Sequence, residues 1–308
     1  MSKRVLITGG AGFIGSHLVR HFADQAEVTV LDDLRSGYAH NLDGVACRFV
    51  RGSILDAKAL REAMADAEEV YHLAAMISVP ESVAKPAECA ELNTEGTRRV
   101  LDAALAAGAR KVVLASSAAI YGDNPTVPKL ESMTPEPKSP YAQTKLAGEH
   151  LLEAYRETHG LGTTSLRFFN VFGPRQDPRS AYAAAVPIFI AKALRDEPIG
   201  IHGDGGQTRD FVHVTDIVGA LAYAGASADM AGTFNVGYGR SQSILELAQE
   251  ILRLTGSKSR IDHLPPRAGD VRHSLASTAR LLAAGWQPRS SVSAGLAETV
   301  EYFRQLKA

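Results

Sequence analysis

Val5-Leu-Ile-Thr-Gly-Gly-Ala-Gly-Phe-Ile-Gly15 is the part of the sequence that best indicates the fold class. Its glycines fit two spacings, G-x-G-x-x-G at positions 10, 12 and 15 and G-x-x-G-x-x-G at positions 9, 12 and 15. Between an apolar run and a helix-like segment, such glycines allow a tight turn, a close backbone approach to a pyrophosphate, and close helix–strand packing. The helix that follows would direct its unpaired N–H groups at the phosphates. The stretch therefore predicts a dinucleotide site at the first strand–helix junction.

The choice of dinucleotide depends on Asp32, which ends the next apolar run. A carboxylate there accepts hydrogen bonds from the ribose diol and repels a 2′-phosphate, so it favours NAD over NADP. Arg35 could instead favour a 2′-phosphate, but the nearer carboxylate should dominate, and we interpret Arg35 as a solvated loop side chain.

The first two thirds of the chain alternate short apolar runs with amphipathic segments. This alternation predicts βαβ units and a parallel sheet covered on both faces. The fold class that we expect is α/β, with a Rossmann-like, doubly wound parallel sheet followed by a smaller C-terminal α/β domain. Predicted strands are Val5–Thr8, Val28–Leu31, Arg48–Arg51, Val70–Leu73 and Lys111–Ser116, and predicted helices among them are Gly15–Ala23, Ala57–Ala65 and Asn93–Ala107.

The pattern changes after about residue 165, where Pro and Gly cluster in loops and strands become sparser. We expect a dinucleotide-binding domain over residues 1–165, to which the chain returns around 208–237, and a ligand-binding domain over 166–308. Helices predicted in the second part are Ala181–Arg195, Thr215–Ala226, Ser243–Leu254 and Val292–Gln305.

Composition narrows the class of protein. The chain has 308 residues, a formal net charge of −1 and 45% hydrophobic residues, which fits a globular protein and not a disordered or collagen-like one. A net charge this close to zero gives no broad attraction for nucleic acid or an anionic membrane. The sequence contains no run of about 18 apolar residues, so no membrane span is predicted. The two cysteines, Cys47 and Cys89, lack metal-ligand spacing. We therefore expect a cytoplasmic protein with no metal site, no nucleic-acid partner and no membrane partner.

A second strong signal is Ser139-Pro140-Tyr141-Ala-Gln-Thr-Lys145. Ser139 suits a helix N-cap and Pro140 the first helical position, so Tyr141 and Lys145 would share one helix face. A nearby ammonium and a helix N-terminus both favour the phenolate, which makes Tyr141 a candidate acid/base for a carbinol proton. Tyr-x-x-x-Lys alone is a weak motif. Its occurrence together with the glycine-rich stretch strengthens the interpretation that Tyr141 and Lys145 belong to an active site.

Ser117 closes the fifth predicted strand, in Ala115-Ser-Ser-Ala-Ala-Ile-Tyr-Gly122. Ligands of open α/β sheets bind at the carboxyl ends of the strands, so Ser117 is placed to hydrogen-bond a substrate hydroxyl and Tyr141. A plain turn-forming role for this serine is the alternative.

Taken together, these motifs resemble the extended short-chain dehydrogenase/reductase family, most closely its UDP-glucose 4-epimerase branch. The resemblance covers nearly the whole chain. Further segments that carry it are His72-Leu-Ala-Ala75, Asn93-x-x-Gly-Thr97, Arg167-x-x-Asn170, Gly203-Asp-Gly-Gly-Gln-Thr-Arg-Asp-Phe-Val-His213 and Arg267-Ala-Gly-Asp270.

The resemblance implies an NAD-dependent epimerase that inverts C4 of a UDP-hexose through a transient 4-keto intermediate. Tyr141 would be the base, Lys145 would hold the nicotinamide ribose and tune Tyr141, and Ser117 would assist proton transfer. Implied cofactor-binding residues are Gly9, Gly12, Phe13, Ile14, Gly15, Asp32, Ser53, Ile54, Leu73, Ala74, Ala75, Asn93, Tyr141 and Lys145. Implied substrate-binding residues are Ser117, Asn170, Val186, Pro187, Arg209, Arg267 and Ser274.

Three positions distinguish relatives within this family. Sugar-nucleotide dehydratases usually carry Asp-Glu after the residue matching Ser117, whereas this chain has Ala118 and Ala119, which cannot move a proton. The small Ser274, at a gatekeeper position, implies that UDP-N-acetylglucosamine and UDP-N-acetylgalactosamine are accepted besides UDP-glucose and UDP-galactose. Ser53 replaces the usual Asp near adenine, which puts the affinity for NAD in doubt more than its identity.

Several alternatives stay open. Arg175 could pair with the C6 carboxylate of UDP-glucuronate, which makes a UDP-glucuronate 4-epimerase the nearest rival. A net reductase and a non-catalytic NAD-sensing protein are two others, and the second is disfavoured because Tyr141, Lys145 and Ser117 are all present. The family further implies a homodimer through residues 93–107 and 141–158.

Overall fold

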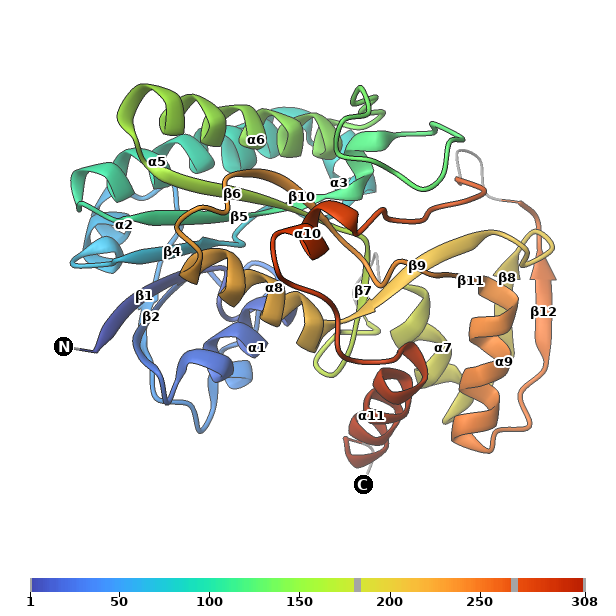
Figure 1. Ribbon diagram of the computed structural model, residues 1–308. Coiled ribbons are helices and arrows are strands. Elements are labelled where there is room, and N and C mark those ends of the chain that lie inside the picture. The colour runs from blue at the N-terminus through green and yellow to red at the C-terminus, as the bar shows by residue number, and fades with distance from the viewer. Residues whose placement is uncertain (1, 180–183, 267–270, 307–308) are drawn as a thin grey trace.

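A computed structural model describes residues 2–179, 184–266 and 271–306 of the chain (Figure 1). Its largest element is a sheet of seven parallel strands in the order β10-β6-β5-β4-β1-β2-β3. The predicted α/β class and the parallel sheet are confirmed. The strands are β1 (Lys3–Thr8), β2 (Ala26–Asp32), β3 (Arg48–Arg51), β4 (Glu69–His72), β5 (Lys111–Ser117), β6 (Gly162–Phe168) and β10 (Gly232–Val236).

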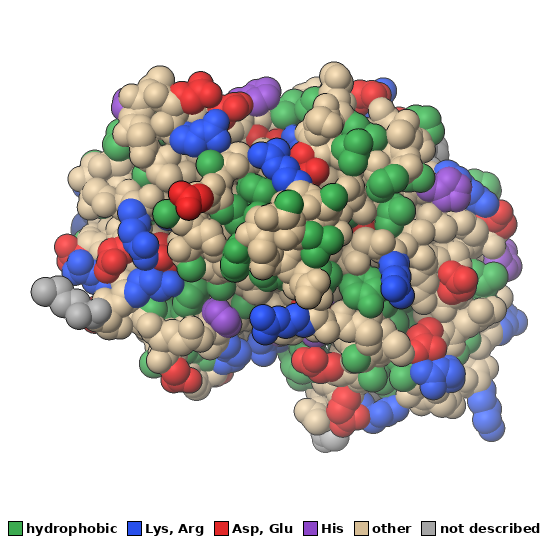
Figure 2. All heavy atoms as spheres, viewed as in Figure 1, with side chains coloured by type: hydrophobic (Ala, Val, Ile, Leu, Met, Phe, Trp, Pro, Cys, Tyr) green, Lys and Arg blue, Asp and Glu red, His purple; other side chains and the backbone are tan. Residues whose placement is uncertain are grey.

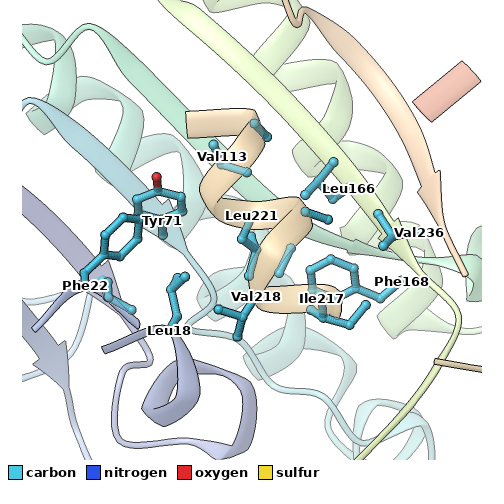
Figure 3. Close-up of a cluster of buried hydrophobic side chains, with 14 of the residues drawn as sticks. Leu18, Phe22, Tyr71, Val113, Leu166, Phe168, Ile217, Val218, Leu221 and Val236 are labelled. Carbon is cyan, nitrogen blue, oxygen red and sulfur yellow. The ribbon is translucent and has the colours of Figure 1, made fainter. Parts of the chain in front are cut away.

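Helices cover both faces of this sheet, as its continuous apolar strands require. One face packs against α1 (Phe13–Phe22) and α8 (Val214–Ala226), which lie below the sheet in Figure 1. Leu18 and Phe22 from α1 and Ile217 and Leu221 from α8 are buried together against the strands, and Figure 3 shows them converging there. Two helices far apart in sequence therefore share one core.

The opposite face packs against α2 (Ala57–Met64), α5 (Gly96–Ala106) and α6 (Pro140–His159). Ser139 caps α6 by accepting a hydrogen bond from the Ala142 N–H, and Pro140 opens the helix, as the sequence predicts. Short helical segments before α5 and after β5 complete this side. They are α3 (Val79–Ala84), α4 (Pro86–Ala90), the π-helical turn Glu91–Glu95 and the 3₁₀ turn Ala118–Tyr121; a further 3₁₀ turn, Ala39–Leu42, follows β2.

Most of the remaining elements form a second, smaller assembly with its own buried core. It holds a three-stranded sheet in the order β11-β9-β7 and a parallel pair of β8 and β12. A capping box between Ser243 and Glu246 opens α9. The strands are β7 (Asn170–Phe172), β8 (Ile199–His202), β9 (Thr208–His213), β11 (Ser241–Ser243) and β12 (Ile261–Leu264), and the helices are α7 (Ala185–Ala193), α9 (Ile244–Thr255) and α11 (Val292–Gln305). The short helix α10 (Ala279–Ala283) instead packs against β10, with Leu281 in the core of the large sheet.

Two sequence expectations differ from the structure. The predicted helix 93–107 is helical, but residues 93–95 belong to a π-helical turn and the α-helix α5 begins only at Gly96. The strands β6 to β12 have no counterpart among the predicted strands. Five of them are only three to five residues long, and polar residues break the apolar runs of the longer β6 and β9.

Charged side chains of both signs are interspersed on the face that Figure 2 shows. Within the described ranges, no helix combines the length and the apolar character needed to cross a membrane.

Candidate active site

A cavity of about 330 Å³ lies along the carboxyl edge of β1, β2, β4 and β5, where ligands of doubly wound sheets bind. The cavity gathers residues from the glycine-rich turn, the end of β2, the loop after β4 and the start of α6. Predicted site residues that line it are Gly9, Gly12, Phe13, Ile14, Gly15, Asp32, Ser53, Ile54, Leu73, Ala74, Ala75, Tyr141 and Lys145.

The turn between β1 and α1 has no room for side chains. Gly9 has φ +74°, and a Cβ added there would lie 2.7 Å from the backbone nitrogen of Ala74. A Cβ on Gly15 would lie 2.1 Å from the carbonyl oxygen of Gly9. The turn is thus compact enough for a phosphate group to approach the N-terminal N–H groups of α1.

Asp32 lies at the end of β2 with 7% of its surface exposed. Its carboxylate accepts hydrogen bonds from the Ala11 N–H at 2.9 Å and the Leu34 N–H at 2.8 Å. Burial raises the pKa of this carboxyl, and the two N–H groups oppose that rise. The side chain is fixed at the cavity wall. Arg35 lines the same wall but pairs with Glu88, so it is less solvated than the sequence suggests.

Tyr141, Lys145 and Ser117 come together at the junction of β5 and α6. The Lys145 ammonium lies 5.8 Å from the centre of the Tyr141 ring and donates to the Ala115 carbonyl at 2.8 Å. Burial lowers the pKa of Lys145 to about 8. Burial raises the pKa of Tyr141, while a hydrogen bond with Ser117 acts in the opposite direction. Burial therefore acts against the phenolate that the sequence argument favours, and the hydrogen bond with Ser117 acts for it.

Other predicted site residues lie outside the wall of this cavity. Asn93 is buried, and its amide binds the backbone N–H and carbonyl of Met76 at 2.7 and 3.0 Å, so it fixes the loop after β4. Asn170 begins β7 with an exposed side chain, whereas Val186 and Pro187 are buried in α7.

Arg209 and Ser274 lie next to each other at the start of β9. The Ser274 N–H donates to the Thr208 carbonyl at 3.1 Å, and Arg209 donates to the same carbonyl at 2.8 Å. Both residues lie outside the cavity wall, and Arg267 lies outside the described residues.

Some residues of the cavity wall were not predicted from the sequence as cofactor contacts. Tyr38, Arg175, Gln176 and Asp177 line the cavity together. Arg175 donates to the Ser16 hydroxyl at 3.1 Å and to the His17 ring at 3.0 Å, so it faces α1. The only signal in the sequence is the Gly-Pro-Arg-Gln-Asp-Pro run at 173–178, which marks a loop and not a contact.

A buried ion pair lies beneath the site. Glu149, one turn after Lys145, accepts from Arg167 at 2.7 Å, and each side chain is 5% exposed. Glu149 also accepts from the Ser116 hydroxyl, and Arg167 donates to the Tyr121 hydroxyl at 2.9 Å. These contacts tie α6 to the ends of β5 and β6.

The arrangement described so far matches a known family. The model of the NAD dependent epimerase/dehydratase family matches residues 5–237. The chain belongs to this family. In the structure of this family member, a glycine turn without room for Cβ atoms and a buried carboxylate at the end of β2 fit NAD. Among the residues that the structure describes, no cluster of His, Cys, Asp or Glu could hold a metal ion.

Individual relatives are similar over their full length. UDP-glucose 4-epimerase of Mycolicibacterium smegmatis is 44% identical over 310 residues, which covers 98% of this chain and 98% of the relative. A Methanobrevibacter ruminantium UDP-N-acetylglucosamine 4-epimerase, solved with UDP-N-acetylmuramic acid, has a TM-score of 0.96 at 38% identity and 99% coverage of both chains. A Thermus thermophilus UDP-glucose 4-epimerase, solved with NAD, has a TM-score of 0.89 at 38% identity, covering 98% of this chain and 99% of that one.

Proposed function

We propose that this chain is an NAD-dependent UDP-sugar 4-epimerase. The observation that carries the proposal is the grouping of Tyr141, Ser117 and Lys145 at the carboxyl end of β5, where Tyr141 and Lys145 line the glycine-bordered cavity. The two residues after Ser117 are alanines, so the acid/base pair that C5 or C6 chemistry requires is missing there. The full-length similarity to UDP-sugar 4-epimerases supports the same reaction.

In the proposed reaction, Tyr141, Ser117 and Lys145 each have a separate role. Tyr141 removes the proton from the sugar 4-hydroxyl and returns it after the ring has turned over in the site. Ser117 shares that proton through its hydrogen bond with the phenol, and Lys145 contacts the nicotinamide ribose. When bound, NAD supplies a reversible hydride acceptor for C4 and a positive charge near the phenol. Such a charge favours the phenolate, against the burial that raises the pKa of Tyr141 in the protein alone.

The proposed substrates are UDP-glucose and UDP-galactose, together with their N-acetylhexosamine counterparts. Ser274 and Arg209 both donate to the Thr208 carbonyl, so a small residue lies close to an arginine, a residue type suited to a pyrophosphate. The segments Asn170, Val186–Pro187 and Arg267 complete the proposed nucleotide-sugar site on the C-terminal side of the chain.

UDP-glucuronate is the second candidate substrate, and the position of Arg175 weakens it. The sequence suggested that this arginine pairs with a C6 carboxylate, but two of its nitrogens are engaged by Ser16 and His17 at the start of α1. Those contacts direct the guanidinium toward the glycine-rich turn.

The division into domains 1–165 and 166–308, the cytoplasmic location and the homodimer are also proposals. The dimer would use the outer surfaces of α5 and α6. On those surfaces Leu105 is 38% exposed, and Tyr155 and Arg98 both contact Asp102. Light scattering tests the dimer, and a monomer at micromolar concentration would contradict it.

The activity is tested by incubating the purified protein, without added NAD, with UDP-glucose, UDP-N-acetylglucosamine or UDP-glucuronate, and following the anomeric protons by NMR. We expect conversion of the first two to their 4-epimers. Conversion of UDP-glucose alone would refute the argument from Ser274, and conversion of the uronate alone would favour the second candidate. No conversion of any of them, even with NAD added, would refute the proposed function.

A further inference from the structure

We propose that residues 173–177 form a clasp over the cofactor: Arg175 faces the pyrophosphate of NAD, and the hydrogen bond between Tyr38 and Asp177 closes the mouth of the cavity. This inference rests on NAD being the cofactor of the proposed epimerase. It assigns to the loop after β7 the retention of NAD between catalytic cycles.

The base of the clasp is held by His17, on the first turns of α1. One ring nitrogen, Nε2, lies 2.8 Å from the Pro174 carbonyl, and the other, Nδ1, lies 3.0 Å from Nη2 of Arg175. A carbonyl only accepts and a guanidinium only donates, so the ring carries its proton on Nε2 and accepts at Nδ1. Burial, reinforced by the charge of Arg175, lowers the pKa of His17 to about 4, so the ring stays in this neutral form. A single tautomer thereby fixes two consecutive residues of the loop to the helix that begins at the dinucleotide turn.

Arg175 is placed by these contacts on the cavity wall, together with Gly12 and Phe13. It adopts φ +67°, a conformation that a non-glycine residue keeps only where its surroundings impose it. The hydrogen bonds of Arg175 go to the neutral Ser16 and His17, and Glu298 acts on it only through its charge, while a guanidinium remains charged even when buried. Such a cation at the N-terminus of a helix is a suitable partner for a pyrophosphate.

The closing contact joins two loops that border the cavity from different parts of the chain. The Tyr38 hydroxyl donates to Asp177 Oδ2 at 2.6 Å. Tyr38 is itself fixed to the dinucleotide turn, because its N–H donates to the Ala11 carbonyl at 3.0 Å. Both residues line the cavity, and in the proposed clasp this hydrogen bond opens when a bound dinucleotide leaves by this side.

Gln176, between the two contacts, provides an independent indication of a ligand. Its Nε2 donates to the Val171 carbonyl at 3.2 Å, whereas its buried Oε1 finds no donor in the described part of the chain. A buried acceptor without a donor is costly, and Gln176 belongs to the cavity wall. A hydroxyl or amide N–H of a bound dinucleotide would satisfy it.

The test measures how fast the cofactor leaves. NADH is loaded onto the purified protein, excess NAD is added, and the loss of bound-NADH fluorescence gives the dissociation rate without any turnover of sugar. Tyr38→Phe removes only the hydroxyl of the closing contact, and we expect dissociation to become roughly 5-fold faster, as for one lost hydrogen bond. Arg175→Met removes a charged partner of the pyrophosphate, and we expect roughly a 10- to 100-fold increase.

Matched controls separate the clasp from general damage. Tyr155→Phe removes another tyrosine–aspartate hydrogen bond, with Asp102 on the α5–α6 surface, and Arg195→Met breaks an exposed pair with Glu197. Both should leave the rate unchanged. Arg175→Lys keeps the positive charge and disturbs the loop less. Its rate of NADH dissociation should lie between the rates of the wild type and of Arg175→Met.

The outcomes distinguish the clasp from the proposed function. Rates within twofold of the wild type in both Tyr38→Phe and Arg175→Met would overturn the clasp, as would a wild-type protein that binds neither NAD nor NADH. Faster dissociation in the variants of a protein that epimerises no UDP-sugar would support the clasp and refute the proposed function.

Discussion

Replacing Glu149 by Gln tests the buried ion pair beneath the site. The change keeps the shape of the side chain but removes the charge that faces Arg167 at 2.7 Å, where both side chains are 5% exposed. Breaking such a pair leaves an uncompensated buried cation, which costs about 3–5 kcal/mol in the free energy of unfolding. For a chain of this length that loss corresponds to a fall in Tm of about 5–8 °C.

Urea and thermal denaturation, followed by circular dichroism, measure this effect. Glu62→Gln is the control, since it breaks a 2.9 Å pair with Arg48 in which the side chains are 53% and 52% exposed, and we expect a change below about 0.5 kcal/mol. Adding Arg167→Met to Glu149→Gln removes the unpaired charge and should recover part of the loss. If the free energy of unfolding of Glu149→Gln lies within about 1 kcal/mol of the wild-type value, then the buried ion pair does not stabilise the fold by the amount expected from its burial.

Three further predictions concern the site and its surroundings. Tyr141→Phe should lower kcat for epimerisation roughly 10²- to 10⁴-fold with bound NAD retained, and an unchanged kcat would exclude Tyr141 as the acid/base. Gly15→Ala should reduce both Tm and NAD content, because its Cβ would lie 2.1 Å from a backbone oxygen. The control is Gly219→Ala in α8, which should be neutral or slightly stabilising because the atom nearest to its Cβ lies 3.4 Å away. Equal effects of the two substitutions would contradict the packing argument. Burial lowers the pKa of His72 to about 3, so between pH 7 and pH 5 the unfolded chain takes up a proton that the folded protein does not. His72 alone should therefore lower the free energy of unfolding by about 2 kcal/mol between these two pH values. Urea unfolding at both pH values, compared with a variant that has a neutral residue at position 72, measures this difference.

The sequence predicted best where one local pattern determines the structure. The glycine-rich turn, Asp32 at the end of β2 and the capped start of α6 depend on neighbouring residues, and the structure shows each of them. The α/β class followed from alternating runs that are buried on both faces of the sheet.

Features that depend on distant contacts were missed. Arg175 reaches His17 across 158 positions of sequence and Tyr38 reaches Asp177 across 139, so no local pattern marks either contact. The burial that raises the pKa of Tyr141 likewise arises from the packed fold, and no local pattern around the motif marks it.

The position of β10 has a practical consequence for anyone who recombines this protein with a relative. This strand and α8 come from residues 214–236, yet β10 hydrogen-bonds β6 at one edge of the large sheet and α8 packs against its centre. A single crossover near residue 165 would therefore join a sheet from one parent to an edge strand and a covering helix from the other. Chimeras should instead inherit residues 1–168 and 214–236 together with α10, whose Leu281 is buried in the same core, and exchange the other segments as one set.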